Sequence, residues 1–301
     1  MDKHKGILLE SGTNEIEIVE FSIGSNKFGI NVIKVKEIIK PVPVTYIPHS
    51  HTHVEGIIEL RGEVLPVVDM AKALGFPPSA EPAQDKFIVA EFNMQKMVFH
   101  VHSVTQIHRI SWESIEKPSG MNKGLLDQIV GIISLEGNMI LLVDFEKIVV
   151  DINPEAGLRS GRLMNFDARE RSEKRVLVAE DSPLLRQLLN DTLAAAGYVN
   201  LKFFDNGREM LDYLETVRES GKKMTDEVKL IITDIEMPKM DGLYLTKYLK
   251  ADDTFRELPV IIFSSLITED LRHKGKMVGA DAQVSKPDIG GLINYMDQLI
   301  L

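Results

Sequence analysis

The chain of 301 residues has no cysteine and no apolar run that approaches the roughly 20 residues needed to cross a bilayer. The missing apolar run excludes membrane insertion. The missing cysteines exclude a disulfide framework, and the N-terminus MDKHKGILLESGTN lacks the apolar stretch and cleavage site of a secretory signal. These absences favour a cytoplasmic protein.

Positive charge is scarce as well. Lysine and arginine number 35 against 45 acidic residues, so the formal net charge is −10 and the isoelectric point is near 5.4. Nucleic-acid binding depends on a basic surface, so this composition argues against it and favours protein partners. The content of 44% hydrophobic and 27% charged residues is that of an ordinary globular protein, and the length predicts two domains.

A polar stretch divides the chain. Between Asp151 and Arg175 the sequence loses its apolar periodicity and becomes rich in charge, as linkers do. Strand-like segments precede this stretch, and apolar strands alternating with amphipathic helices follow it, which indicates a parallel α/β sheet. We therefore predict a first domain at residues 1–150, a linker at 151–174 and a second domain at 175–301.

The first domain contains an internal repeat. GIIELRGEVLPVVDMAK from Gly56 and GIISLEGNMILLVDFEK from Gly131 align without gaps at an offset of 75 and are identical at eight of 17 positions. Ordinary residue usage predicts about one identity. Each copy predicts a hairpin followed by an Asp that caps a short helix. With further strands at residues 21–28 and 87–104, the pattern predicts two small β-barrels or sheets, packed side by side with a seam for partners.

Three local features of this domain lead to further expectations. Val32, Val35, Ile38 and Ile39 have helical spacing and stop before Pro41, so we expect a short helix there. Arg61 at one hairpin tip is replaced by Glu136 at the other, and Arg61 is either a solvated turn residue or a contact to a partner. The alternating histidines of PHSHTH at residues 48–53 suggest Zn²⁺ binding, but a clear fourth ligand is missing, and we favour a solvated loop.

The second domain carries reactive side chains where its strand-like runs end: Glu180 and Asp181, Asp234, Ser264, and Lys286. The carboxyl ends of parallel strands gather at one edge of a sheet, so these residues meet. Carboxylates brought together repel one another unless a cation lies between them. Mg²⁺ prefers oxygen ligands, so we predict a Mg²⁺ site here, with the backbone carbonyl of Glu236 as a further ligand. Asp234 can attack a phosphoryl group while the Lys286 ammonium and the Ser264 hydroxyl contact its oxygens.

The acidic pair is fixed at the junction of a strand and a helix. Ser182 is suited to cap that helix and Pro183 to its first turn, while Gly197 ends it. An unrelated metal-dependent hydrolase on a similar fold stays possible from these residues alone.

Residues 175–301 resemble a response-regulator receiver domain in the motifs VLVAED, TDIEMPKMDG, IIFSS and VSKP. The resemblance implies a flavodoxin-like fold and transfer of a phosphoryl group from a phosphohistidine to Asp234. It also implies Mg²⁺ held mainly by Asp181, Asp234 and the Glu236 carbonyl, with Glu180 assisting. Two positions depart from the family: Glu180 stands where Asp is commoner, and Gln283 stands where many receivers carry an aromatic residue that swings inward on phosphorylation.

Residues 16–150 are similar to the CheW family of chemotaxis coupling proteins in FGINVIKVKEI, in VTYIPHSHTHVEGIIELRGEVLPVVDM and in the second repeat copy. This implies two similar five-stranded barrels, each with one copy of the hairpin. It further implies binding to chemoreceptor tips and to the histidine kinase CheA, with receptor-facing positions at Val35, Glu37, Gly56 and Arg61. Glu59 replaces the Asn usual in that family. A coupling domain followed by a receiver is the arrangement of the CheV family.

The function expected from both resemblances is a non-catalytic adaptor. It couples chemoreceptors to CheA at cytoplasmic receptor–kinase arrays, and Mg²⁺-dependent phosphorylation of Asp234 regulates it, giving adaptation. The alternative is a phosphate sink that drains phosphoryl groups from the kinase. A transcription factor is disfavoured because the sequence has no basic helix-turn-helix pattern.

Overall fold

The computed structural model describes residues 12–92, 95–117, 128–135, 137–153, 172–265, 267 and 269–300, and at Leu184, Glu269 and Asp270 the backbone alone. The chain divides into two compact units, one of residues Ile16–Arg159 and one of Met1–Glu15 together with Ser160–Leu301. Most of the predicted linker at 151–174 lies outside the described residues, so its bounds stay a prediction.

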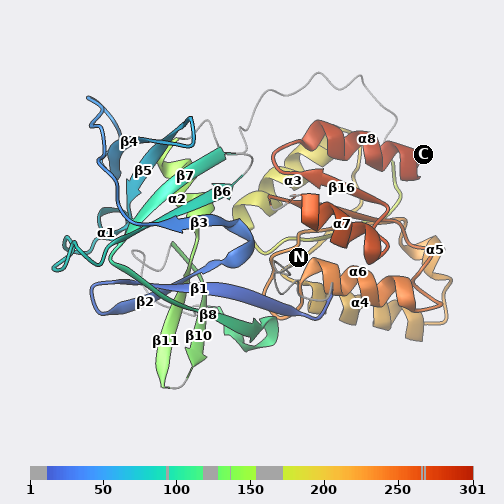
Figure 1. Cartoon of the computed structure of the whole chain (residues 1–301). Coiled ribbons are helices and arrows are strands. Elements are labelled where there is room, and N and C mark those ends of the chain that lie inside the picture. Colours follow the sequence, from blue (N-terminus) through green and yellow to red (C-terminus); the bar gives the residue numbers. More distant parts are fainter. Residues whose placement is uncertain are drawn as a thin grey trace, which may run out of the picture. The chain divides into compact units, whose positions relative to one another are not determined.

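The first unit is all-β with two short helices, and its described strands form two sheets (Figure 1). One sheet has the order β8-β1-β2-β11-β10-β9, from β1 (Glu15–Ile23), β2 (Asn26–Asn31), β8 (Ser103–Ser111), β9 (Ile115–Glu116), β10 (Ile129–Leu135) and β11 (Asn138–Val143). The other has the order β3-β6-β7-β5-β4, from β3 (Val35–Ile39), β4 (Val54–Leu60), β5 (Glu63–Asp69), β6 (Lys86–Phe92) and β7 (Gln95–Val101). Five strands were expected in each, and the first sheet has six.

One apolar core joins the two sheets. Phe145, at the start of α2 (Phe145–Ile152), has its ring centroid 6.0 Å from that of Phe21 in β1 and 4.8 Å from that of Phe99 in β7. All three side chains are fully buried, and burial of each contributes about 1.5–3 kcal/mol to folding. The sheets therefore share a core and belong to one domain.

The repeat folds as predicted into matching hairpins, β4–β5 and β10–β11. Both are antiparallel, and both shift register just before the glycine that the two copies share, Gly56 in the first copy and Gly131 in the second. Asp69 accepts a hydrogen bond from the backbone N–H of Lys72 and caps α1 (Met70–Ala73), and Asp144 caps α2 in the same way. Corresponding strand pairs and capping residues of the two copies are therefore also 75 positions apart.

The helix expected from residue 32 to residue 39 was wrong. A 3-10 turn, η1 (Val32–Lys34), leads directly into strand β3, which pairs antiparallel with β6. The segment VKEII is rich in β-branched residues, which favour strands when a partner strand is available. Tertiary pairing with β6 therefore prevailed over the local spacing.

The second unit has five parallel strands in the order β13-β12-β14-β15-β16: β12 (Val176–Ala179), β13 (Leu201–Phe204), β14 (Leu230–Thr233), β15 (Val260–Ser264) and β16 (Ala282–Ser285). Its helices are α3 (Pro183–Ala195), α4 (Gly207–Glu219), α5 (Met224–Glu227), α6 (Gly242–Ala251), α7 (Glu269–Met277) and α8 (Ile289–Ile300) (Figure 1). One apolar cluster packs α4, α5 and α6 on the sheet, and another packs α3 and α8. This is the flavodoxin-like fold expected.

The strand order also locates the site. The chain goes from β12 to β13 on one side and then to β14 on the other, so the order reverses beside β12. Ligands of such sheets bind at the carboxyl ends of the strands at this reversal. Among the helices of the described segments, none is long and apolar enough to cross a membrane.

Candidate functional site

The receiver gathers the predicted acidic residues at the reversal point of its sheet. Glu180 and Asp181 directly follow β12, and Asp234 directly follows β14. One carboxylate oxygen of each lies within 4.8 Å of those of the other two. The topology therefore brings together side chains that are far apart in the sequence.

Lys286, directly after β16, supplies a cation to this cluster. Its Nζ donates to Oδ2 of Asp234 at 2.7 Å and to Oε2 of Glu180 at 2.8 Å. All three side chains are buried, so little water screens these charges. The sequence predicted that Lys286 lies near the site, and the structure adds that its ammonium already bridges two carboxylates.

The buried carboxyl of Glu180 has a raised pKa. Burial is the largest cause, because it disfavours the charged form, and the charge of Asp234 acts in the same direction. The Lys286 ammonium and the backbone N–H of Ser182, which donates to Oε1 at 3.2 Å, oppose this shift. Glu180 therefore keeps its proton to a higher pH than an exposed glutamate does.

Local chain geometry holds the acidic pair and Asp234 in place. Ser182 caps α3 by accepting a hydrogen bond from the N–H of Leu185, with Pro183 in the first turn, as predicted. Oδ1 of Asp234 accepts from the N–H of Ile235 at 2.6 Å. A Cβ at position 242 would stand 1.9 Å from the Asp234 carbonyl oxygen, so only glycine fits where the loop turns into α6.

The buried acidic cluster fits a divalent cation. Three carboxylates and one ammonium leave a formal charge of −2, and the available donors are the oxygens that hard cations prefer. From the sequence, we expected a metal ion to offset the repulsion between the carboxylates. In the structure the Lys286 ammonium offsets part of this repulsion. The Glu236 carbonyl lies two residues beyond Asp234, and its role as a further ligand stays a prediction.

Ser264 and Gln283 lie on the neighbouring strands. Ser264 is the last residue of β15 and is fully buried, and its contact with a phosphoryl group stays a prediction. Gln283 is fixed to α7: its Nε2 donates to the Arg272 carbonyl at 2.8 Å, and a Cβ at position 275 would lie 2.3 Å from its Oε1. Gln283, which stands where many receivers carry an aromatic residue, therefore makes a specific contact with helix α7.

In the coupling domain the structure brings two of the four predicted receptor-facing residues together. Arg61 at the tip of the β4–β5 hairpin contacts Glu37 of β3, with Nη2 2.8 Å from Oε2. These strands lie at opposite edges of the sheet order, and Thr45, after β3, forms a bridge with Ile57 of β4. The two edges of this sheet therefore approach each other, as in a barrel.

Gly56 and Val35 have structural roles of their own. A Cβ at position 56 would lie 2.1 Å from the carbonyl oxygen of Thr45, and the φ of 154° also favours glycine. Val35 is half-buried against the shared core. Contact with a receptor stays a prediction for both. Glu136, the counterpart of Arg61, lies outside the described residues.

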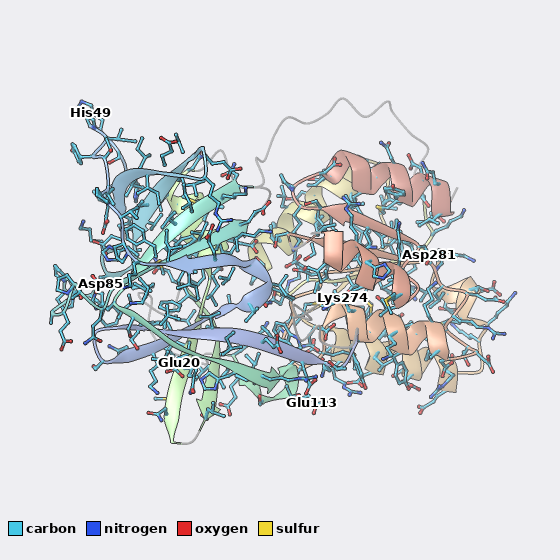
Figure 2. All side chains as sticks on the ribbon, in the orientation of Figure 1. Glu20, His49, Asp85, Glu113, Lys274 and Asp281 are labelled. Atoms are coloured by element: carbon cyan, nitrogen blue, oxygen red, sulfur yellow. The ribbon has the colours of Figure 1, made fainter. Side chains whose placement is uncertain are left out.

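The alternating histidines at residues 49–53 do not bring three ligand atoms within 4.8 Å of one another in the described part of the chain. The acidic cluster of the receiver is the three-ligand group found there, and no histidine belongs to it. Figure 2 shows His49 at the end of the loop between β3 and β4. His51 and His53 stack edge to face, and Nδ1 of His51 accepts from the His53 backbone N–H at 3.2 Å. This agrees with the loop interpretation.

Comparison with known proteins gives the two units their families. The model of the CheW-like domain matches residues 17–153, and the model of the response regulator receiver domain matches residues 176–296. The fold and the acidic site therefore define a CheW-like domain joined to a receiver.

Individual relatives match either one domain or both domains of the chain. The chain is 34% identical to chemotaxis protein CheV3 of Helicobacter pylori over 91% of both chains. A probable chemotaxis protein CheW of Rhizobium etli is 33% identical over 46% of this chain and 91% of its own. A crystal structure of scaffolding protein TtCheW from Thermoanaerobacter tengcongensis aligns with 42% of this chain and 88% of its own at 30% identity, with a TM-score of 0.41. From the match to CheV3 across both domains, the chain belongs to the CheV family of chemotaxis proteins.

Proposed function

We propose that the chain is a non-catalytic adaptor that couples chemoreceptors to the kinase CheA, and that phosphorylation of Asp234 regulates this coupling. The observation that carries the proposal is the buried cluster in which Lys286 contacts Asp234 at 2.7 Å beside two further carboxylates. Such a cluster suits a carboxylate that accepts a phosphoryl group.

The proposed reaction is a simple displacement. A carboxylate oxygen of Asp234 attacks the phosphorus of a phosphohistidine on CheA, the P–N bond breaks, and the imidazole leaves and takes up a proton. The Lys286 ammonium and the Ser264 hydroxyl then hydrogen-bond the phosphoryl oxygens. Asp181, Asp234 and the Glu236 carbonyl, assisted by Glu180, would hold Mg²⁺, which would supply further positive charge.

The proposed partners follow from the coupling domain. Chemoreceptor tips contact the surface around Val35, Glu37, Gly56 and Arg61, and CheA is both phosphoryl donor and binding partner. The exposed Arg61 side chain and its ion pair with Glu37 support a charged recognition surface at the hairpin tip. The site of action is the cytoplasmic receptor–kinase array.

Acetyl phosphate with Mg²⁺ tests the acceptor directly. Wild type should take up one phosphoryl group, and Asp234→Asn should take up none. Asp212→Asn, which changes an exposed aspartate of α4, is the matched control and should be labelled like wild type. Equal labelling of Asp234→Asn and wild type would refute the assignment.

A reconstituted receptor–kinase assay separates the adaptor from a phosphate sink. Receptors, CheA and this chain are combined with no other receiver present. If the chain is a regulated adaptor, Asp234→Asn changes how strongly receptors control the kinase. If it is only a sink, the variant leaves receptor control unchanged and abolishes the loss of phosphoryl groups.

A further inference from the structure

The short segment Gly12–Asn14, just before β1, packs against the receiver and belongs to the same compact unit. Asn14 is 6% exposed although it precedes a strand of the other domain. Its side-chain amide makes two hydrogen bonds to a loop 225 and 227 positions away: Nδ2 donates to the Lys239 carbonyl at 2.9 Å, and Oδ1 accepts from the Asp241 N–H at 3.1 Å. One side chain thus bridges two backbone groups of one loop.

Gly12 provides a second point of attachment, on α6. Its carbonyl oxygen lies 3.5 Å from Nζ of Lys247, which donates to it. A Cβ at position 12 would lie 2.7 Å from Cδ of Lys247, and the φ of 70° also favours glycine. The segment therefore fits closely against the lysine stem.

The loop that Asn14 contacts begins at the proposed phosphoacceptor. Ile235 donates its N–H to the Asp234 carboxylate, and Gly242 donates its N–H to the Ile235 carbonyl at 3.1 Å. Lys239 has a φ of 66°, a conformation that few non-glycine residues adopt. The loop thus runs from Asp234, whose side chain accepts its first N–H, to the Lys239 carbonyl and the Asp241 N–H that Asn14 contacts.

We propose that Gly12–Asn14 is an intramolecular clasp that senses the phosphorylation of Asp234 and transmits it to the start of β1. The occupant of this receiver surface is the chain's own segment, and Asn14 is covalently joined to Glu15, the first residue of β1. The regulatory part of this inference rests on the proposed function. Coupling between two sites is reciprocal, so docking of the clasp also changes the equilibrium of the loop.

Phosphorylation loosens the clasp. A phosphoryl group on Asp234 turns the carboxylate that accepts the Ile235 N–H into a mixed anhydride, whose remaining oxygen is a weaker acceptor, and adds charge beside the loop. The loop then rearranges, and the Lys239 carbonyl and the Asp241 N–H lose the spacing that one amide side chain can bridge. Residues 12–14 become more accessible, and β1 loses its attachment to the receiver loop.

Because the chain has no cysteine, a single introduced thiol can report on docking of the clasp to the receiver, without phosphorylation. Thr13→Cys introduces a single thiol at a half-buried position inside the clasp, and its rate of modification by a thiol reagent reports on opening. Adding Asn14→Ala should raise this rate about tenfold, because two buried hydrogen bonds are lost. Adding Asn26→Ala, which removes an exposed amide of β2, should leave it unchanged. Equal rates with and without Asn14→Ala overturn the clasp.

A second measurement tests the coupling. Acetyl phosphate and Mg²⁺ are added to Thr13→Cys protein, and intact mass gives the phosphorylated fraction in the same sample. Phosphorylated chains should be modified several-fold faster than unphosphorylated chains, and this difference should vanish in Asn14→Ala. Normal phosphoryl uptake with an unchanged rate overturns the coupling but leaves the acceptor in place. Absence of uptake refutes the proposed function instead, and the first measurement still tests the clasp.

Discussion

Two ion pairs of nearly equal length lie in opposite surroundings. Nζ of Lys286 is 2.7 Å from Asp234 in the receiver, with side chains 4% and 8% exposed. Nη2 of Arg61 is 2.8 Å from Glu37 in the coupling domain, with side chains 78% and 27% exposed. The interaction between charges depends on the surrounding medium as well as on distance, so the two pairs differ in strength and in use.

The difference shows what burial contributes. Water screens the Arg61 pair, which is worth about 0–1 kcal/mol and leaves the guanidinium free to exchange Glu37 for a partner's carboxylate. The Lys286 pair is cut off from water, so a change of charge at Asp234 must be answered by movement of protein groups. The buried site therefore suits a switch, and the exposed one suits recognition.

Removing the buried cation should have the largest effect. Lys286→Met leaves Glu180 and Asp234 buried without their partner, and we expect a loss of about 3–5 kcal/mol in the free energy of unfolding of the receiver. Urea denaturation measures this. Lys222→Met, which removes an exposed ion pair with Glu227, is the control and should cost less than about 1 kcal/mol. A comparable small loss for both variants contradicts the contrast.

Asp241 shows what burial does to a carboxylate on which no cation acts strongly. Burial raises its pKa to about 6, although backbone N–H groups of α6 oppose the shift. The folded state then binds more protons than the unfolded state between about pH 4 and pH 6, so stability falls as the pH rises through this window. Asp241→Asn keeps the cap and lacks this titration.

The stability of wild type relative to Asp241→Asn should therefore decrease by roughly 2 kcal/mol between pH 4 and pH 7. Unfolding by urea at a series of pH values measures the difference. Asp212→Asn, at an exposed site of α4, should run parallel to wild type. Parallel curves for Asp241→Asn as well would contradict the raised pKa.

His100 of the coupling domain is intermediate in burial. Burial alone would lower its pKa, but hydrogen bonds to Glu55 at 2.7 Å and to Asp85 at 3.0 Å raise it overall (Figure 2 labels Asp85). Its contribution to stability is then fully present below about pH 6.5 and is lost as the pH rises through the folded-state pKa.

His100→Gln should remove this dependence, on the order of 1 kcal/mol as for other charge-assisted hydrogen bonds. NMR titration of the ring and urea denaturation at two pH values measure it. His49→Gln, in the exposed loop, is the control. A His100 pKa below the ordinary histidine value of about 6.5 would count against the arrangement.

Arg61→Ala should have the smallest effect on stability, below about 1 kcal/mol. Its effect on binding should be larger, about a tenfold weaker affinity for receptor tips if the guanidinium meets a desolvated carboxylate. Pull-down or calorimetry measures this, with Lys96→Ala, an exposed cation of the same sheet, as control. Unchanged affinity removes Arg61 from the recognition surface.

Much of the site was readable from the sequence because its residues follow recognisable local patterns. Asp181 and Asp234 each follow an apolar run. Ser182 and Pro183 predict the start of a helix, and the structure confirms that α3 begins there. The repeat likewise predicted two hairpins and two Asp caps. The prediction of a helix after Val32 failed because the spacing of its apolar residues fits a helix. The strand with which this segment pairs, β6, lies some 50 residues away in sequence.

The sequence by itself determined the repeated hairpins, the helix caps and the gathering of carboxylates at one sheet edge, because these depend on near neighbours and on strand order. Only the tertiary structure decided that Lys286 bridges Glu180 and Asp234, that Arg61 reaches Glu37, and that Asn14 holds the Lys239–Asp241 backbone. Such contacts join distant parts of the chain. Their distances and burial are set by how whole elements pack, and no local pattern encodes that.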